Sequence, residues 1–338
     1  MTKRRSRSSP SASPADLLAR GREVSSAIEK EISKVVYGEE LRSLVDILIL
    51  GLFADGHIGT QAPVGLAKTL ACNALSAAIG GVSRKRQFRP DMLPSEISGF
   101  EVYNQKTQEF EVRHGPLYGT NIFLADELNR GTPKAQAALL EAMEERYLTI
   151  GSEVHPLPLV FLVLATWNPM EHEGTYLLPE AQLDRFFARP VIRNVGEGTG
   201  MQVLADPDFW RIAEKRLTRV QSVTKPAEIV AIREAIFTTV HVEPRLDRYI
   251  WRLRDATWNH EMVKYGSSPR GAINLKKAAM VAAFREGSAY VTPEHVRKYA
   301  VDVLAHRVFM KPEHRFDPDR ALSPADIIRE VLDEVRYD

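Results

Sequence analysis

Two runs of mostly aliphatic residues constrain the fold of this chain more than any other feature. One covers residues 121–127 and the other covers residues 159–166. Each run is followed by a segment in which apolar residues recur with the spacing of a helix, at residues 133–145 and 179–187. Strands that alternate with helices predict an α/β fold with a parallel, doubly wound sheet, in which ligands bind at the carboxyl ends of the strands.

A short loop upstream has the composition of a phosphate-binding site. Residues 61–69 (QAPVGLAKT) connect a predicted strand, residues 57–61, to a predicted helix, residues 66–79. The general pattern is G-x-x-x-x-G-K-[ST], in which main-chain N–H groups surround the phosphates and the lysine reaches their oxygens. Lys68 and Thr69 fill the last two positions, but alanine replaces both glycines. The preceding strand is also more polar than a buried parallel strand usually is.

The two alanines differ in their expected effect. Ala67 stands where the helix begins, and we expect no steric problem there because alanine is a good helix former. Gly65 is the residue at which we expect a positive φ. Ala62 stands where a glycine would let the main chain approach a phosphate, and strain of about 1–3 kcal/mol at such a position would weaken nucleotide binding. The loop is therefore predicted to work, but less well than the usual pattern.

Polar residues at the ends of the two aliphatic runs are the next candidates. At a strand end, Asp126 can hold Mg²⁺ while Glu127 polarises water, although an acidic loop after a core strand would look the same. The upstream Lys68 and Thr69 favour the first interpretation, because both sites would meet at one edge of the sheet. Asn168 could position water against a γ-phosphate or form a turn, and the spacing leaves both open.

Composition excludes several classes of protein. The net charge is +1, which gives no support for a nucleic-acid or anionic-membrane surface. No apolar run reaches the roughly 18 residues of a membrane span, so we expect no span and a cytoplasmic location. The single cysteine, Cys72, excludes an internal disulfide and is expected to be a buried core residue. Residues 1–15 are basic and rich in serine, which predicts a disordered tail.

Local patterns divide the chain further. Residues 99–113 and 147–157 alternate apolar and polar side chains around polar turns, which predicts two β-hairpins. After about residue 195 the pattern is helical throughout, with a break near residues 224–226. We therefore predict a basic tail, an α/β core that contains the two hairpins, a linker and a helical domain, at residues 1–15, 16–195, 196–224 and 225–338.

Four strings of residues resemble the MoxR family of AAA+ ATPases, in the helix-2-insert branch of the AAA+ P-loop proteins. They are residues 123–130 (FLADELNR), 133–146 (PKAQAALLEAMEER), 165–169 (ATWNP) and 173–186 (EGTYLLPEAQLDRF). The resemblance extends over about residues 24–310. It implies a P-loop core with a parallel sheet and flanking helices, and a small C-terminal all-α lid domain. It also implies that the two hairpins are the helix-2 insert and the pre-sensor-1 insert of this branch.

The resemblance implies ATP and Mg²⁺ as cofactors and assigns residues to them. Lys68 and Thr69 would hold the phosphates, Thr69 and Asp126 would hold Mg²⁺, and Glu127 would activate water. The residues that contact the nucleotide would come from an adenine-contacting turn and from the phosphate loop. They are Val35, Val36, Tyr37, Pro63, Val64, Gly65, Leu66, Ala67, Lys68, Thr69 and Leu70.

The same resemblance gives catalytic roles to residues farther along the chain. Asn168 would sense the γ-phosphate, and Arg185 would be an arginine finger that reaches the nucleotide of a neighbouring subunit. Arg270, at a Ser-Pro-Arg helix start, would be the second sensor on the lid. From the residues alone, Arg185 could instead pair with Asp184, and Arg270 could be a surface cation, although a cation is unfavourable at a helix N-terminus.

Three functions are compatible with these features. The resemblance implies ATP hydrolysis in a homo-oligomeric, hexameric ring that remodels or assembles a client protein, with a von Willebrand factor A domain protein as a partner. The first alternative is a nucleotide-regulated scaffold with vestigial hydrolysis, because Ala62 and Ala67 alter the loop. The second is a DNA-translocating motor, which kinship with the MCM helicases and the basic tail suggest and the near-neutral net charge opposes.

Overall fold

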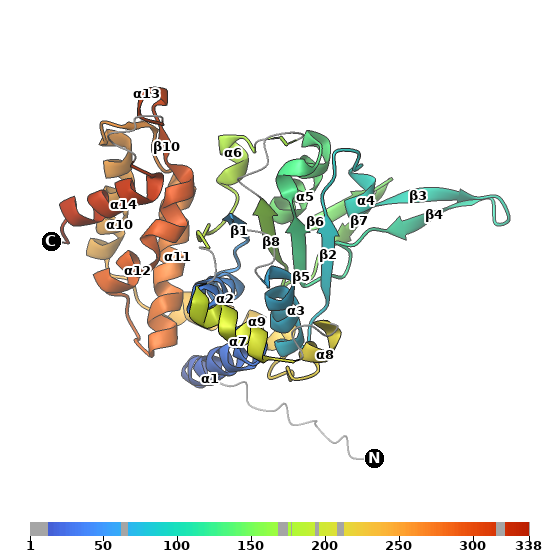
Figure 1. The fold of residues 1–338 in the computed structure, drawn as a ribbon, viewed down its shortest axis with the longest axis horizontal. Helices are drawn as coiled ribbons and strands as arrows, with labels where there is room; N and C mark the ends of the chain where they lie inside the picture. Colours follow the sequence, from blue (N-terminus) through green and yellow to red (C-terminus); the bar gives the residue numbers. More distant parts are fainter. Residues whose placement is uncertain are drawn as a thin grey trace, which may run out of the picture.

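A parallel sheet forms the centre of the molecule (Figure 1). The computed structural model describes residues 13–61, 67–167, 175–176, 178–192, 196–207, 213–315 and 322–337. Within these ranges the sheet has four parallel strands in the order β1-β8-β5-β2. The strands are β1 (Ile58–Gln61), β2 (Ser83–Gln87), β5 (Ile122–Asp126) and β8 (Leu162–Trp167). The predicted α/β fold with a parallel sheet is therefore confirmed.

Helices cover both faces of this sheet. They are α1 (Pro14–Ser33), α2 (Glu39–Ala54), α3 (Lys68–Ala78) and α5 (Pro133–Glu145). Leu124 of β5 belongs to the buried cluster that contains α1, α2 and α3, whereas its neighbour Phe123 belongs to the cluster that contains α5. Adjacent side chains of a strand point to opposite faces, so a continuous aliphatic run is what a strand buried on both faces requires. Cys72 is buried on α3, as predicted.

Strand β2 was not predicted from the sequence. Its five residues, SRKRQ, are polar and mostly exposed, and no hydrophobic pattern marks them as a strand. The pairing of Lys85 with Leu124 and of Gln87 with Asp126 places this strand directly beside β5. Two other boundaries differ from expectation, since β8 begins at Leu162 and the helix expected over residues 179–187 is the single turn α6 (Glu180–Leu183).

The polar composition of β1 has a packing explanation. A Cβ atom on Gly59 would lie 2.6 Å from the ring of Trp167 on β8, so the close approach of these strands requires glycine. The hydroxyl of Thr60 donates a hydrogen bond to the carbonyl of Pro190 at 3.0 Å, which satisfies its buried side chain. This strand is therefore a well-packed part of the sheet.

The first described residues already belong to a helix. Ser13 caps α1, and its side chain and that of Asp16 form a reciprocal capping box. Ser13 and Pro14 fall inside the tail predicted for residues 1–15, and they belong instead to the start of this helix. Residues 1–12 lie outside the described residues.

Both hairpins expected from the alternating pattern are present. They are β3 (Gly99–Asn104) with β4 (Glu109–His114), and β6 (Tyr147–Ile150) with β7 (Glu153–Pro156). The β3–β4 hairpin follows the short helix α4 (Ser95–Ser98) and extends away from the sheet, on the side opposite the C-terminal helices (Figure 1). Phe100, Tyr103 and Phe110 of this hairpin are exposed.

The C-terminal part of the chain is mainly helical, as expected. Its helices are α7 (Glu197–Ala205), α8 (Ala213–Leu217), α9 (Pro226–Thr239), α10 (Pro244–Asn259), α11 (Pro269–Glu286), α12 (Pro293–Leu304), α13 (Pro312–Arg315) and α14 (Pro324–Glu334). A short antiparallel ladder of β9 (Val263–Tyr265) and β10 (Phe309–Met310), which the sequence did not predict, joins these helices. Helix α9 packs against α1 and α2, while α10, α11, α12 and α14 lie together beside β1 (Figure 1).

Among the described residues, no helix is long and apolar enough to cross a membrane.

Candidate active site

Residues from three elements meet at the carboxyl edge of the sheet. Asp126 is the last residue of β5, and Lys68 and Thr69 are the first two residues of α3. Lys85 of β2 connects these elements, because its Nζ lies 2.7 Å from Oδ2 of Asp126 and donates to Oγ1 of Thr69 at 3.4 Å. The Asp126 and Thr69 oxygens predicted to bind a metal ion therefore face one ammonium group.

Asp126 is held as a carboxylate. Its side chain is 18% exposed and accepts a hydrogen bond from Thr166 Oγ1 at 2.7 Å. Burial raises the pKa of Asp126, but the hydrogen bonds from Lys85 and Thr166 outweigh burial and leave that pKa below its ordinary value. The group is therefore ionised at neutral pH, as a metal ligand must be.

Glu127 lies beside Asp126 with a left-handed main chain, at φ 54° and ψ 45°. Its main-chain N–H donates to Thr166 Oγ1 at 3.1 Å, so Thr166 links the two acidic residues. Its side-chain Oε2 accepts hydrogen bonds from Gln87 at 3.0 Å and from Arg130 at 3.1 Å. These two donors hold the carboxylate in one position at the edge of the sheet.

Lys68 is the first residue of α3, and its ammonium group lies near the charges of Asp126 and Lys85. Burial lowers the pKa of its ammonium group, the charge of Asp126 opposes this effect, and the charge of Lys85 adds to it. An additional anionic ligand would stabilise both ammonium groups, and the N-terminus of a helix such as α3 favours bound anions.

The main chain before Lys68 differs from the expectation. Ala67 caps α3 in the left-handed region, with φ 37° and ψ 18°. From the sequence we expected no steric problem at this alanine and a positive φ at Gly65, so the expectation for Ala67 was wrong. A Cβ atom is unfavourable in this region, which is why the usual pattern has glycine before the lysine. Ala62, Pro63, Val64, Gly65 and Leu66 lie outside the described residues.

The turn predicted to contact adenine lies between α1 and α2. The side chains of Val35 and Val36 are buried in the core, so a ligand at this turn would meet the main chain and Tyr37. The Tyr37 hydroxyl donates to Asp206 at 2.8 Å and accepts from Arg219 at 3.3 Å. These contacts join the turn to the segment that follows α7. Leu70 of α3 is also buried, and Asn168 lies outside the described residues.

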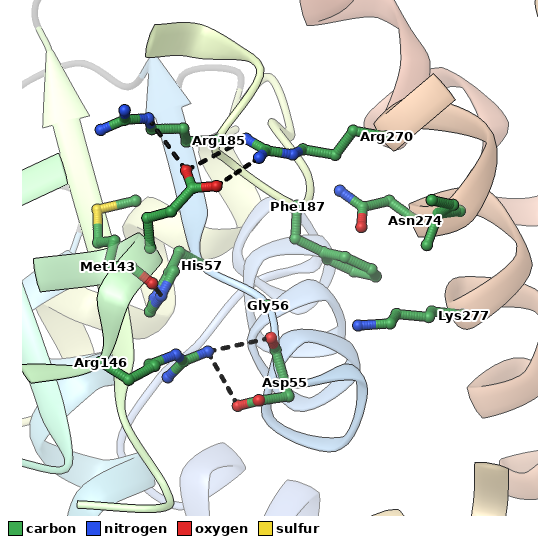
Figure 2. A pocket seen from close by; sticks show the side chains of 12 residues that line it. Asp55, Gly56, His57, Met143, Arg146, Arg185, Phe187, Arg270, Asn274 and Lys277 are labelled. Atoms are coloured by element: carbon green, nitrogen blue, oxygen red, sulfur yellow. Dashed lines mark hydrogen bonds and ion pairs between the residues drawn. The ribbon is translucent and has the colours of Figure 1, made fainter. Parts of the chain in front are cut away.

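Arg185 and Arg270 lie together on one carboxylate. Arg185 Nε is 3.2 Å from Oε2 of Glu144, and Arg270 Nη2 is 2.5 Å from Oε1 of the same group (Figure 2). They line a cleft of about 410 Å³ between the start of β1, the end of α5 and helix α11. Among the described residues, the lining of this cleft does not include Lys68 or Asp126. The suggested pairing of Arg185 with Asp184 is not seen; Glu144 is its partner.

Asp184 has a different partner. It accepts a hydrogen bond from Arg307 Nε at 2.8 Å and another from the Ser268 hydroxyl at 2.7 Å. Ser268 caps α11 two residues before Arg270, and Asp184 directly precedes Arg185. The Asp184 carboxylate therefore fixes the two arginine-bearing segments relative to each other.

The oxygen atoms at the carboxyl edge suit Mg²⁺ and a nucleotide. Magnesium prefers hard oxygen ligands, commonly a carboxylate together with phosphate oxygens, and a threonine hydroxyl is a usual partner in phosphate-binding loops. Asp126 and Thr69 supply this donor set, and Lys68 supplies a charge for phosphate. The residues present therefore fit the cofactors that the sequence suggested.

Sequence reasoning missed four polar residues of this site: Lys85, Gln87, Arg130 and Thr166. Lys85 and Gln87 belong to the unrecognised strand β2, and their spacing of two residues places them on the same face of the strand. Thr166 had a signal, since it is a polar residue at the carboxyl end of an aliphatic run. A doubly wound sheet also requires a strand after α3, which could have drawn attention to β2.

Models of two known families match the chain. A model of the "ATPase family associated with various cellular activities (AAA)" matches residues 57–188. A model of the "AAA lid domain" matches residues 255–331. The first range includes the parallel sheet and the residues at its carboxyl edge, and the second includes α11, α12 and most of α14.

Similar proteins support the same assignment. The Bacillus subtilis protein YeaC is 36% identical over 309 residues, which are 91% of this chain and 92% of that protein. The Mycobacterium tuberculosis protein named "Chaperone MoxR1" is 34% identical over 318 residues, which are 90% of this chain and 80% of that protein. A crystal structure from Cytophaga hutchinsonii, of a protein assigned as an ATPase, has 34% identity and a TM-score of 0.85, and covers 96% of this chain and 97% of that one. The chain belongs to the MoxR family of AAA+ ATPases.

Proposed function

We propose that this protein binds ATP with Mg²⁺ and hydrolyses it at the carboxyl edge of the sheet. The observation that carries the proposal is the meeting of Asp126, Thr69 and Lys68 at this edge, with Glu127 beside them. Mg²⁺, when bound, would neutralise charge on the phosphate oxygens. Thr69 and Asp126 would hold the ion, and Lys68 would bind the phosphates.

Glu127 is the proposed base of the reaction. Its carboxylate would accept a hydrogen bond from the attacking water and orient it toward the γ-phosphate. The hydrogen bonds from Gln87 and Arg130 keep the carboxylate in place, and Thr166 fixes the main chain on which it stands. Asn168 is proposed as the sensor of the γ-phosphate.

The two cleft arginines support an assembly of several subunits. Because Arg185 and Arg270 share Glu144, they would reach a phosphate together, and the cleft they line is distinct from the edge that holds Lys68 and Asp126. We propose that both act on the nucleotide of a neighbouring subunit in a ring, for which a hexamer is the expected form. The name of the relative "Chaperone MoxR1" supports a client protein as the target of this ring. A partner with a von Willebrand factor A domain remains a proposal from the family resemblance.

Glu127→Gln tests the reaction. The amide keeps the size of the side chain but removes the base, so ATP hydrolysis should fall by about a hundredfold or more while ATP binding is retained. Phosphate release and nucleotide affinity measure the two effects separately. Glu145→Gln is the control, because it changes an exposed acid at the end of α5. Unchanged hydrolysis in Glu127→Gln would contradict the assignment.

A scaffold that binds nucleotide without turnover is the second candidate. The left-handed main chain at Ala67 favours it, because strain in the loop would weaken phosphate binding. Hydrolysis that rises with protein concentration and is lost in Arg185→Ala would favour the ATPase ring. Binding-driven assembly without phosphate release in the wild-type protein would favour the scaffold.

A further inference from the structure

Lys85 occupies an unusual place for a strand lysine. Its ammonium group lies between Oδ2 of Asp126 and Oγ1 of Thr69, at 2.7 Å and 3.4 Å. These two residues are the proposed ligands of Mg²⁺, so this inference rests on the proposed function. We propose that Lys85 is a tethered cation that fills the metal position in the nucleotide-free protein and must withdraw before a divalent ion can bind.

The Lys85 ammonium group and a metal ion cannot occupy the position between Asp126 and Thr69 at the same time. Magnesium binds oxygen ligands at about 2.0–2.1 Å, so an ion held by Asp126 and Thr69 would occupy the space in which the ammonium group lies. Two positive charges at such a separation repel each other strongly in a partly buried site. Asp126 is only 18% exposed, which limits screening by solvent. Lys85 and the metal ion therefore compete for the same carboxylate.

The side chain of Lys85 is also able to leave. It is 40% exposed, and its four-carbon stem is flexible, so the ammonium group can move toward solvent or toward phosphate oxygens without a change in the sheet. A purely structural ion pair would need only Asp126. The second contact with Thr69, on a different element, is the feature that matches the position of a metal ion.

The proposed exchange has a consequence for the order of binding. Without nucleotide, the ammonium group already neutralises Asp126, so a free divalent ion gains little by entering. Phosphates would attract Lys85 away from Asp126 and bring the metal ion with them. The protein would therefore bind Mg²⁺ weakly by itself and strongly together with ATP.

Divalent-ion binding to the nucleotide-free protein tests this proposal directly. Mn²⁺ is used as the probe, because the free ion is quantified by electron paramagnetic resonance. Lys85→Met removes the charge and keeps the length of the side chain, so the dissociation constant for Mn²⁺ should fall by about tenfold or more. Lys85→Arg keeps a positive charge and should remain close to the wild type.

Matched controls separate competition from a general loss of charge. Arg84→Met removes a charge from the neighbouring residue of β2, which points to the other face, and should leave Mn²⁺ binding unchanged. Asp126→Asn combined with Lys85→Met should abolish the gain, because the ligand is lost. Lys85→Gln provides a second neutral variant, and thermal unfolding is recorded for every protein.

The outcomes distinguish this inference from the proposed function. Equal or weaker Mn²⁺ binding in both neutral variants overturns the tethered-cation role, and so does a failure of both to fold, which would make Lys85 a structural partner of Asp126. ATP hydrolysis by the wild type is measured in the same preparations. Hydrolysis together with unchanged Mn²⁺ binding in the variants rejects this inference alone. Absence of hydrolysis in the wild type rejects the proposed ATPase, whatever the Mn²⁺ result.

Discussion

Ala67 has the main-chain conformation of a glycine directly before the lysine that would bind phosphate. Its φ of 37° places a Cβ atom in the left-handed region, where a side chain costs roughly 1–2 kcal/mol. Ala67→Gly should remove this strain, and the greater freedom of glycine in the unfolded chain offsets about 0.5–1 kcal/mol of the gain. We expect unfolding free energy to rise by up to about 1 kcal/mol and ATP affinity to increase by a few-fold, measured by urea denaturation and nucleotide titration.

Ala71→Gly is the comparison for this prediction. Ala71 lies inside α3 and is buried, so glycine there should destabilise the protein by about 1 kcal/mol or more. A stability loss of similar size in Ala67→Gly would show that the left-handed conformation carries no strain. Ala62→Gly remains a separate test of the beginning of the loop.

Arg307 joins the lid to the segment that carries Arg185. It lies in the short 3-10 helix η2 (Ala305–Arg307), its side chain is 1% exposed, and it donates to Asp184 and to the carbonyls of Phe186 and Phe187. Burial lowers the pKa of Arg307 to about 10, so the group stays charged at neutral pH. The Arg307 side chain therefore supplies hydrogen bonds that the carbonyls of this segment would otherwise need from water.

Arg307→Met should therefore destabilise the protein strongly. The substitution takes from Asp184 its charged partner, although Ser268 still donates to it, and removes a hydrogen-bond donor from several buried carbonyls. Breaking a buried pair costs about 3–5 kcal/mol. Urea denaturation measures this loss. Arg329→Met is the matched control, because Arg329 is 57% exposed and pairs with Asp326 on the surface, where a loss of at most about 1 kcal/mol is expected. Similar losses in the two variants would contradict the structural role of Arg307.

Two buried histidines couple the stability of the whole molecule to pH. His57 accepts a hydrogen bond from the N–H of Val163 on Nδ1 and donates to the carbonyl of Met143, so it is neutral. Burial lowers the pKa of His57 and of His306 well below 6.5. In the unfolded chain both would bind a proton near pH 6.5, so stability is complete above this pH and falls by about 1.4 kcal/mol per histidine and pH unit below it.

Asp302 acts in the opposite direction over part of this range. Burial raises the pKa of Asp302 to about 6, so below that pH the folded protein binds a proton that the unfolded chain does not. The two histidines outweigh this one group. We expect the unfolding free energy to fall by about 3 kcal/mol between pH 7.5 and pH 5, measured by urea denaturation. His57→Gln should reduce the fall by about two-thirds, because one histidine contributes roughly 2 kcal/mol over this pH range.

His241→Gln is the control for this pH dependence. His241 is exposed, and its loss should leave the pH profile unchanged. A profile that is flat between pH 7.5 and pH 5 in the wild type would contradict the neutral state of the buried histidines.

Prediction from the sequence succeeded where the signal was local. The runs that became β5 and β8 are continuously aliphatic, as a strand buried on both faces requires, and the hairpins show the alternation of half-buried strands. It failed for β2, because a polar strand is defined by its partner β5 and not by its own residues. It also assigned no joint contact to Arg185 and Arg270, because their shared acid, Glu144, lies on a third element.

The sequence by itself determined the aliphatic strands, the two hairpins, most of the helices and the polar residues that end the aliphatic strands, because these features follow from the pattern of a few neighbouring residues. The tertiary structure decided which charges face each other. Lys85 meets Asp126 through the pairing of β2 with β5, and Arg185 meets Arg270 through Glu144 of α5. Such contacts depend on register and packing between residues distant in the chain, which no local pattern encodes.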